Sequence, residues 1–559
     1  MKGLVKNMVS IMKKIVVLGI ALFLVACTLA EEPELNTTVE IELPALFSDG
    51  MVLQRQAKIP VWGWAVKNAN VTVTFSNQSK STTAGEDGKW LLYLDPLTAS
   101  AEPAEFTVKV GDKSKVVKDV LVGEVWLCSG QSNMDFTLKS ISNKSKKVDP
   151  YALADMVKKE ITEARDPLLR QIKVEKCLSP FSVKEKFEGE WINSSPDNNA
   201  SFTAVGYYFA RVLRKKLNVP VGLIKSAWGG TRVEPWIPME AYQGSEKLKT
   251  YYQQEIGTVK NWDPIKAKEL YEKQLAEWKK EVEKAKSEKR NKRVAKPRMT
   301  RGPDSNNRIP SAIYNTQIHP LIPFAIKGVI WYQGESNKDH CSEEYADRFT
   351  TLIRSWRKAW GQGDFPFYYA QLANFSAISR DPIETDDWAT VCDQQRLSLR
   401  EKNTGMAVLN DIGDAGNIHP KNKFDVGLRL ALWALAKDYG NKDLVFSGPL
   451  YKNSVFEGAK VTVTFSHVGD GLMVGEKKGV QPTVEIQAEL KGFQICGADR
   501  VWQWANAKIV STNQVEVSHP QIKKPVEVRY AWAKNADFAN LYNKAGLPTS
   551  LFKSVNPSN

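Results

Sequence analysis

The chain has 559 residues, of which 42% are hydrophobic and 10% aromatic, so it is globular and long enough for roughly two to four domains. Its formal net charge of +14 comes mainly from a leader with four lysines and from residues 266–301, which hold fourteen basic and six acidic residues. The rest of the chain is nearly balanced, which argues against a nucleic-acid-binding protein.

The first residues have the pattern of an export signal. Four lysines precede an apolar run at residues 15–26, which is too short to span a membrane as a mature helix. The run ends in LVAC, which resembles a bacterial lipobox. We therefore expect residues 1–26 to be a signal peptide and Cys27 to carry a lipid anchor that holds the protein on the cell envelope, facing the periplasm or on the outer-membrane surface. A plain secretory signal is the alternative.

The cysteines that follow Cys27 do not form a recognisable set. They are odd in number and no two have CxxC spacing, which argues against a disulfide framework and against a zinc site. We expect mostly buried thiols at Cys128, Cys177, Cys341, Cys392 and Cys496.

Short alternating strands separated by Gly, Asn and Asp turns predict a small β-sandwich over residues 39–119. The expected strands are at residues 58–64, 71–75, 89–94 and 105–110.

A serine then follows a strand-like segment. The apolar, β-branched run at residues 120–127 predicts a buried central strand, and Gly130 permits a sharp turn that would lift Ser132 above the sheet edge. A serine hydroxyl is a poor nucleophile unless a base takes its proton, so a catalytic Ser132 requires a histidine elsewhere. A loop serine that caps the next helix is the alternative.

Strands alternate with helices over residues 120–442, which predicts an α/β domain with a parallel sheet covered on both faces. Active residues are expected at the carboxyl ends of its strands. A helical insertion at about residues 240–305 interrupts this pattern with a long solvated helix, packed along one apolar stripe. From residue 443 to residue 559 the chain returns to short strands, which we expect to brace the sheet rather than bind glycan.

Several motifs follow one another from about residue 40 to the end of the chain, at residues 44–55, 130–134, 226–231, 331–337, 525–532 and 540–548. In this order they resemble the motifs of the sialate O-acetylesterase family, a branch of the SGNH/GDSL hydrolases. The resemblance implies a three-layer α/β/α domain of SGNH type, flanked by β-sandwich-like domains. It also implies an enzyme that removes acetyl groups from sialic acid hydroxyls without a metal or an organic cofactor.

His419 follows the last predicted strand of the sheet and precedes a helix that begins near residue 425. By resemblance, this is the position from which an SGNH-type base reaches the serine. His419 would take the Ser132 proton during attack on an ester carbonyl, protonate the departing sugar oxygen and then activate the water that releases acetate. A structural loop histidine is the alternative.

The third member of a triad is open. Many SGNH enzymes have an acid three residues before the histidine, but this chain has a glycine there. Asp414 could turn back to the imidazole, Asp411 is further away, Glu335 is a second candidate, and a backbone carbonyl could also orient the ring. We predict a dyad of Ser132 and His419, with Asp414 as a helper.

The resemblance also supplies an oxyanion hole, whose donors must point to where negative charge develops. We expect the amides of Ser132 and of Gly229 or Gly230 to act together with the Gln333 side chain. The paired glycines suit a close approach of the backbone to a ligand.

Four polar residues are candidates for substrate contact. Glu335 and Asn337 are expected to brace the loops beside the substrate. The carboxylate of a sialic acid needs a cation, and either Arg232 or Arg396 could supply a bidentate clamp, although a structural ion pair would also explain each of them.

The sequence thus predicts a lipid-anchored bacterial carbohydrate esterase that acts on O-acetylated sialic acids. An esterase for acetyl xylan or another glycan is the rival among enzymes. A non-catalytic glycan-binding surface lipoprotein is the rival from another class, but a binding module has no need for both Ser132 and His419.

Overall fold

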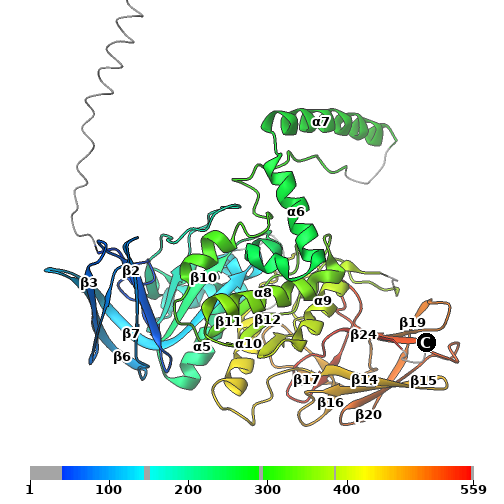
Figure 1. Ribbon diagram of the computed structural model, residues 1–559. Coiled ribbons are helices and arrows are strands. Elements are labelled where there is room, and N and C mark those ends of the chain that lie inside the picture. The colour runs from blue at the N-terminus through cyan, green and yellow to red at the C-terminus, as the bar shows by residue number, and fades with distance from the viewer. Residues whose placement is uncertain (1–40, 144–151, 289–293, 383–384, 556–559) are drawn as a thin grey trace, which may run out of the picture.

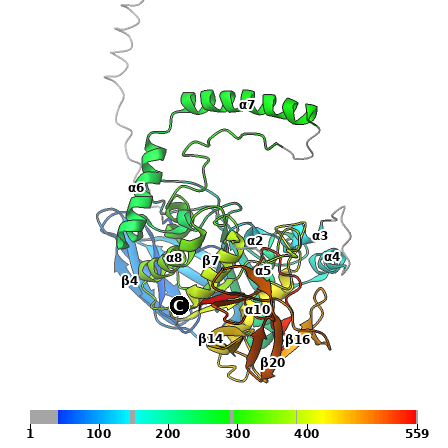
Figure 2. The same ribbon diagram turned by 90° about the vertical axis from the view of Figure 1, so that its right-hand side faces the viewer.

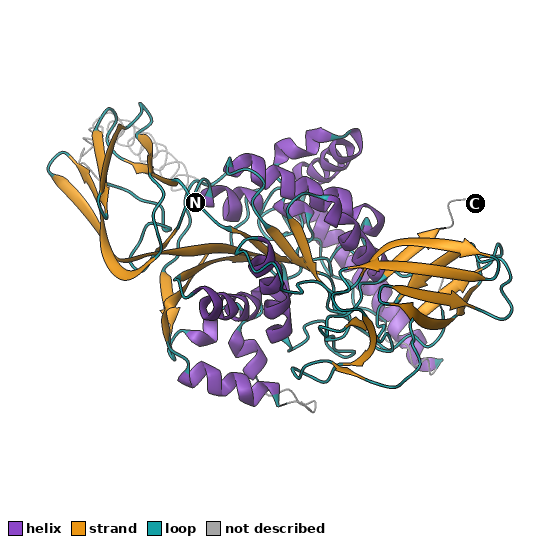
Figure 3. Cartoon of the chain, turned by 90° about the horizontal axis from the view of Figure 1, so that it is seen from below, coloured by secondary structure: helices purple, strands orange, loops and turns teal. Residues whose placement is uncertain are grey.

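The computed structural model describes residues 41–143, 152–288, 294–382 and 385–555. The chain forms a central α/β region with β-sheets at both ends (Figures 1 and 3). The proposed signal peptide and Cys27 lie outside the described residues. Among the described residues, no helix is both long and apolar enough to span a bilayer. The five described cysteines are free thiols, and Cys128, Cys392 and Cys496 are buried.

The central sheet is mostly parallel, as the alternation of strands and helices predicts. Its strand order is β13-β12-β11-β7-β10-β8-β9, and only the edge strand β9 runs antiparallel to its neighbour. The mixed α/β class with additional β domains is thereby confirmed. The strands are β7 (Lys113–Gly130), β8 (Asp166–Lys173), β9 (Trp191–Ser194), β10 (Val221–Ala227), β11 (Gly328–Tyr332), β12 (Phe367–Ala370) and β13 (Thr404–Ala407).

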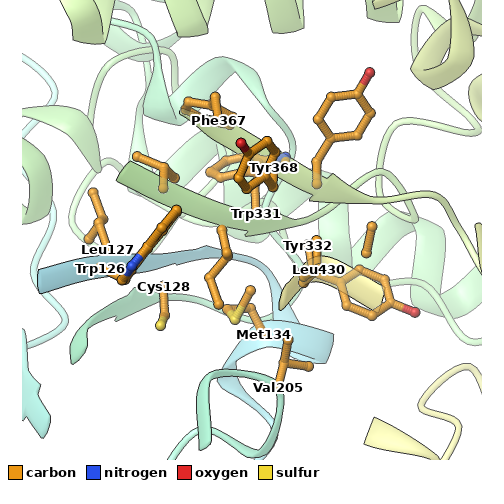
Figure 4. Packing of buried hydrophobic residues seen from close by; sticks show 14 of the residues in the cluster. Trp126, Leu127, Cys128, Met134, Val205, Trp331, Tyr332, Phe367, Tyr368 and Leu430 are labelled. Carbon is orange, nitrogen blue, oxygen red and sulfur yellow. The ribbon is translucent and has the colours of Figure 1, made fainter. Parts of the chain in front are cut away.

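Helices cover the sheet (Figures 1 and 3), and aromatic and aliphatic side chains pack between the helices and the sheet (Figure 4). The main helices are α5 (Ala204–Leu217), α8 (Tyr345–Trp360), α9 (Asp387–Leu397) and α10 (Lys423–Lys437). Trp126 of β7 packs edge-on against Phe209 of α5, with ring centroids 4.9 Å apart. Trp331 of β11 stacks on Phe349 of α8 at 5.9 Å. Since side chains alternate along a strand, consecutive residues contribute to the two opposite layers of this core.

Strand β7 belongs to two sheets. Up to Val122 it pairs antiparallel with β6 (Ser100–Val110) in the N-terminal sheet, and from Glu124 to Gly130 it pairs parallel with β10. At Gly123 between these parts, a Cβ atom would lie 2.0 Å from the Pro220 carbonyl oxygen, so the close crossing requires glycine. The boundary predicted between residues 119 and 120 therefore falls inside one continuous strand.

The N-terminal region contains the four expected strands and two more. β1 (Val52–Gln54) pairs parallel with β7, and β4 (Gln78–Thr83) pairs antiparallel with β3. The sequence of β4, QSKSTT, is entirely polar and so lacks the hydrophobic alternation that predicts a strand. The remaining strands are β2 (Ile59–Trp64), β3 (Asn70–Phe75) and β5 (Lys89–Leu94).

The insertion forms an arm with helices α6 (Glu246–Lys260) and α7 (Pro264–Ser287), and α7 stands away from the body (Figures 1 and 2). The apolar stripe of α7 packs on the segment of the insertion that follows α7, not on the α/β core. Trp278 is half-buried, and its indole donates to the Val294 carbonyl at 3.1 Å. On α7 only Ala285 is buried.

Three small sheets form the C-terminal region. They contact the loops that follow β12 and β13: the Gln371 amide donates to Ser550 Oγ, and the Asn410 amide donates to the Thr549 carbonyl, each at 2.9 Å. These contacts hold the ends of the two outer parallel strands. The strand orders are β14-β15-β21-β20, β17-β16-β23 and β19-β18-β22-β24. The strands are β14 (Leu450–Glu457), β15 (Lys460–Ser466), β16 (Leu472–Glu476), β17 (Val484–Glu485), β18 (Phe493–Cys496), β19 (Trp502–Trp504), β20 (Asn506–Ser511), β21 (Gln514–Ser518), β22 (Glu527–Tyr530), β23 (Leu541–Asn543) and β24 (Phe552–Val555).

Candidate active site

Ser132 lies on a tight turn at the carboxyl end of the central strand. β7 ends at Gly130, and Ser132 begins the short helix α2 (Ser132–Asp135). Gly130 has φ of +134°, and a Cβ atom there would lie 2.2 Å from the Tyr332 carbonyl oxygen, so the turn requires glycine. Gln131, not Ser132, is the N-cap residue of α2. The Ser132 hydroxyl is therefore not used as a helix cap.

His419 meets this serine. It lies in the loop between β13 and α10, and its Nε2 atom is 2.8 Å from Ser132 Oγ. The Phe136 ring stacks on the imidazole with centroids 5.8 Å apart and planes inclined by 14°. Burial and the nearby Lys423 ammonium lower the pKa of His419. The neutral ring, which a general base requires, is thus favoured.

No carboxylate orients the imidazole in the described part of the chain. Asp414 accepts the backbone N–H of Gly416 at 2.8 Å, within its own turn. Asp411 forms a two-pronged ion pair with Arg429 of α10, at 2.6 and 2.7 Å. Neither aspartate hydrogen-bonds to His419, so the geometry gives Asp414 no direct part in orienting the base.

The paired glycines lie against the serine. A Cβ atom on Gly229 would lie 3.2 Å from Ser132 Cβ, and Gly230 has φ of +75°. Among the described residues, none accepts a hydrogen bond from the backbone N–H groups of Ser132, Gly229 or Gly230. These amides are available to an oxyanion.

The expected oxyanion donor Gln333 and the expected substrate contact of Asn337 require a correction, whereas the expectation that Asn337 braces the loops agrees with its contacts. Both are fully buried, and the Gln333 amide donates to Asn337 Oδ1, the Thr231 carbonyl and Gln131 Oε1 at 2.7, 3.2 and 3.3 Å. Asn337 also accepts the Val233 N–H at 3.0 Å. Because these polar atoms are already paired with protein groups, Gln333 does not present a donor to the oxyanion and Asn337 does not reach substrate. The two side chains instead join the loops after β7, β10 and β11.

A buried polar cluster adjoins the serine and the histidine. Asn133 donates to Glu335 Oε1 and, at 3.0 Å, to the Ile418 carbonyl, while Lys423 Nζ donates to Asn133 Oδ1 at 2.5 Å. Lys423 is 0% exposed and Glu335 is 4% exposed. Burial lowers the pKa of Lys423 to about 7 and raises the pKa of Glu335. Glu335 therefore contacts neither His419 nor solvent, and it does not act as the missing triad acid or as a direct substrate ligand.

Two arginines flank the glycine turn. Arg308, from the returning end of the insertion, donates through Nε to the Gly230 carbonyl at 3.3 Å, and Arg232 follows Gly230 in the chain. Burial and then repulsion from Arg232 lower the pKa of Arg308. In the described part of the chain neither guanidinium forms an ion pair, and the buried Arg232 Nε has no hydrogen-bond partner. Two guanidinium groups that form no ion pair with a described residue thus lie beside the turn.

The model of the carbohydrate esterases known as sialic acid-specific acetylesterases matches residues 122–288 and 307–434, which is more than half of the chain. The chain belongs to this family. The chain is 30% identical over 520 residues to the sialate O-acetylesterase of Mus musculus, covering 86% of this chain and 87% of that one. The sialate O-acetylesterase of Rattus norvegicus is 29% identical, with 86% and 88% covered. A solved structure of a carbohydrate acetylesterase from Xanthomonas citri shares 35% identity and a TM-score of 0.73, covering 92% of this chain and 99% of that one.

Membership of the family supports a carbohydrate esterase and implies an acetylated glycan as substrate.

Arg396 lies outside the site. Its Nε atom binds Asp393 Oδ1 at 2.7 Å on the same helix, and its guanidinium lies over the Tyr451 ring. Arg396 thus forms the structural ion pair that was its alternative explanation. The predicted contact of Arg396 with substrate is wrong.

The sequence gives little indication that three residues belong to this site. Arg308 is 78 positions from Gly230, and nothing local links the two. Lys423 reads as an ordinary polar residue at a helix start. Asn133, next to Ser132 in the family motif, is the one whose position could have drawn attention.

Proposed function

We propose that the protein is a serine esterase that hydrolyses acetyl esters on sialic acids, with Ser132 as nucleophile and His419 as general base. The observation that carries the proposal is the 2.8 Å contact between His419 Nε2 and Ser132 Oγ at the carboxyl edge of the sheet. The geometry needed for proton transfer is therefore present before substrate binds.

The reaction follows from these positions. As Ser132 Oγ bonds to the acetyl carbon, His419 Nε2 takes its proton, and the carbonyl oxygen becomes an oxyanion. The amides of Ser132 and of Gly229 or Gly230 supply donors for that charge. The imidazolium then gives its proton to the sugar oxygen as the ester bond breaks. A water molecule, deprotonated by His419, releases acetate and restores the serine.

Two arginines without an ion-pair partner among the described residues support an acidic sugar as substrate. Arg232 and Arg308 stand beside the glycine turn without an ion-pair partner among the described residues, and Asp339 is the carboxylate whose field reaches Arg308. A guanidinium binds a carboxylate through paired charge-assisted hydrogen bonds. A sialic acid presents such a carboxylate on the same sugar that bears the acetyl esters, whereas xylan does not.

Acetate release tests the proposal. It is measured with O-acetylated sialic acid and with acetylated xylan for the unaltered enzyme, Ser132→Ala and Arg232→Ala. We expect sialic acid to be preferred, Ser132→Ala to be inactive on both substrates, and Arg232→Ala to lose activity on sialic acid alone. Equal activity of Ser132→Ala and the unaltered enzyme would end the serine mechanism. A preference for xylan would leave that mechanism intact and replace the substrate.

The proposal includes export and anchoring through Cys27. It is supported by the lysines, the apolar run and the LVAC string of the leader. Fractionation of cells tests it: the full chain should be found with membranes, and Cys27→Ser should release it into the soluble envelope fraction or block its processing. A Cys27→Ser chain that is processed normally and still found with membranes would refute the anchor.

A further inference from the structure

A buried lysine lies beside Ser132 and His419, and the proposed reaction does not use it. Lys423, the first residue of α10, is completely shielded from solvent. Removing an ammonium from water is unfavourable, and an apolar residue of similar length would avoid that cost. The presence of Lys423 next to an active site therefore points to a task other than stability.

The contacts of Lys423 show what it orients. The Asn133 amide has one acceptor end and one donor end: Lys423 binds the acceptor and Glu335 binds the donor. The two opposite charges fix which way round the amide lies. We call Asn133, Glu335 and Lys423 the buried clamp.

The buried clamp joins the nucleophile to the base. Asn133 directly follows Ser132, and its remaining N–H donates to the carbonyl of Ile418 at 3.0 Å, one residue before His419. A single side chain thus connects the serine turn with the histidine loop. In a Ser-His-Asp triad a carboxylate on Nδ1 does this orienting, and none of the described carboxylates occupies that position here.

The clamp also sets the charge around the imidazole. Lys423 Nζ lies 5.1 Å from the centroid of Phe136, the ring that stacks on His419, and 5.4 Å from that of Tyr332. The other titratable groups that face the clamp are Tyr332 of β11, Tyr345 of α8 and Cys392 of α9. Burial raises the pKa of each, so they stay uncharged near neutral pH.

We propose that the buried clamp positions His419 against Ser132 and sets the charge around the imidazole, in place of a triad carboxylate. The proposal rests on the proposed catalytic roles of Ser132 and His419. The members of the buried clamp are positioning residues, because they touch His419 only through the backbone of the His419 loop and through Phe136.

The test uses the full chain with para-nitrophenyl acetate, a probe that does not depend on the identity of the sugar. The variants are Lys423→Met, Glu335→Gln and the double substitution, with Lys421→Met as a matched control. Lys421 lies two residues from Lys423, and its ammonium donates to the Asn143 carbonyl, away from the dyad. The measurements are kcat, KM, the pH profile of kcat/KM and Tm.

We expect Lys423→Met to lower kcat roughly 10- to 100-fold, the range that misplaced catalytic groups give, with KM little changed. The acid limb of kcat/KM should move to higher pH, because losing a neighbouring positive charge raises the pKa of His419. In Glu335→Gln the acid limb of kcat/KM should not move to higher pH. The double substitution should recover the Tm lost in Lys423→Met, since no buried carboxylate is left unpaired, and keep the low kcat and the shifted limb.

The double substitution is decisive even if Lys423→Met fails to fold. Unaltered kcat in that protein, or a loss of kcat with an unmoved acid limb, would mean that Lys423 serves packing only and would overturn the proposal. Failure of the underlying mechanism looks different, because Ser132→Ala would then keep its activity. Lys421→Met should match the unaltered enzyme in every measurement.

Discussion

His419 Nε2 lies 2.8 Å from Ser132 Oγ, although 287 positions separate the two residues in the chain. The serine follows the central strand, whereas the histidine follows β13 at the sheet edge, with β12 and β11 between. The histidine loop must therefore cross the ends of two strands. At Gly413 in this loop a Cβ atom would lie 2.1 Å from the Asn374 carbonyl oxygen, which shows how closely the loop follows the chain beneath it.

Removal of either member of the dyad should abolish turnover. Ser132→Ala and His419→Ala should each lower kcat at least roughly 10³-fold, and the double substitution should lose no more than the single ones, since the residues act as a unit. Acetate release under saturating substrate measures this. Additive losses would contradict the dyad.

Asp414→Ala should change kcat less than about threefold, because its carboxylate caps a turn and does not contact the imidazole. Asp411→Ala should instead lower the free energy of unfolding by about 3–5 kcal/mol, since it leaves the buried Arg429 unpaired. Denaturant unfolding and kcat, measured on both variants, separate the two effects. A tenfold loss of kcat in a well-folded Asp414→Ala protein would restore Asp414 to the mechanism.

The pH dependence should reflect the lowered pKa of His419. The neutral imidazole is the active base, so kcat/KM should rise with pH as the ring loses its proton, with a midpoint below the ordinary value of 6.5. A profile of kcat/KM from about pH 4 to about pH 8 checks this. A midpoint above 6.5 would show that a nearby negative charge outweighs both burial and the Lys423 ammonium at the ring.

Arg232→Ala and Arg308→Ala should raise KM for O-acetylated sialic acid roughly 10- to 100-fold, the loss expected for a charge-assisted hydrogen bond, and leave para-nitrophenyl acetate hydrolysis unchanged. Arg396→Ala is the matched control. It should lower Tm by breaking the ion pair with Asp393, with KM unaffected. Equal KM values for all three variants would remove the acidic sugar from the proposal.

Gly130→Ala should prevent a functional turn, because the added Cβ would meet the Tyr332 carbonyl at 2.2 Å and the backbone is in a conformation that favours glycine. Gly257→Ala offers a contrast inside α6, where nothing lies within 4 Å of the new atom. It should stabilise the protein by about 0.5–1 kcal/mol. Circular dichroism, Tm and acetate release distinguish the two.

Local signals explain which parts were predictable. Ser132 and His419 each lie in a short string with its own glycine turn or loop position, and the alternation of strands with helices fixes both to the carboxyl edge of a parallel sheet. The acidic candidates could not be ranked this way. Whether Asp414 turns toward the ring or caps its own turn depends on loop geometry that composition does not carry.

The misassigned residues share one cause. A sequence shows that Gln333 lies beside the site, but not whether its amide faces substrate or the Asn337 and Gln131 side chains. Arg396 likewise reads as a free cation until Asp393, one helical turn away, is seen to bind it. Hydrogen-bond partners are decided by three-dimensional packing, so polar residues are the hardest to place from sequence.

Strand β7 connects the N-terminal sheet directly to the turn that carries Ser132. One backbone runs without interruption from Lys113 to the Gly130 turn, and β1 and β6 flank it before its pairing with β10 and β11 begins. Amide hydrogens along the whole strand should therefore exchange through the same global opening, and the two regions should melt in a single transition. A chain begun at residue 120 would lose the first seven of the 18 residues of that strand and expose bare edges to self-association.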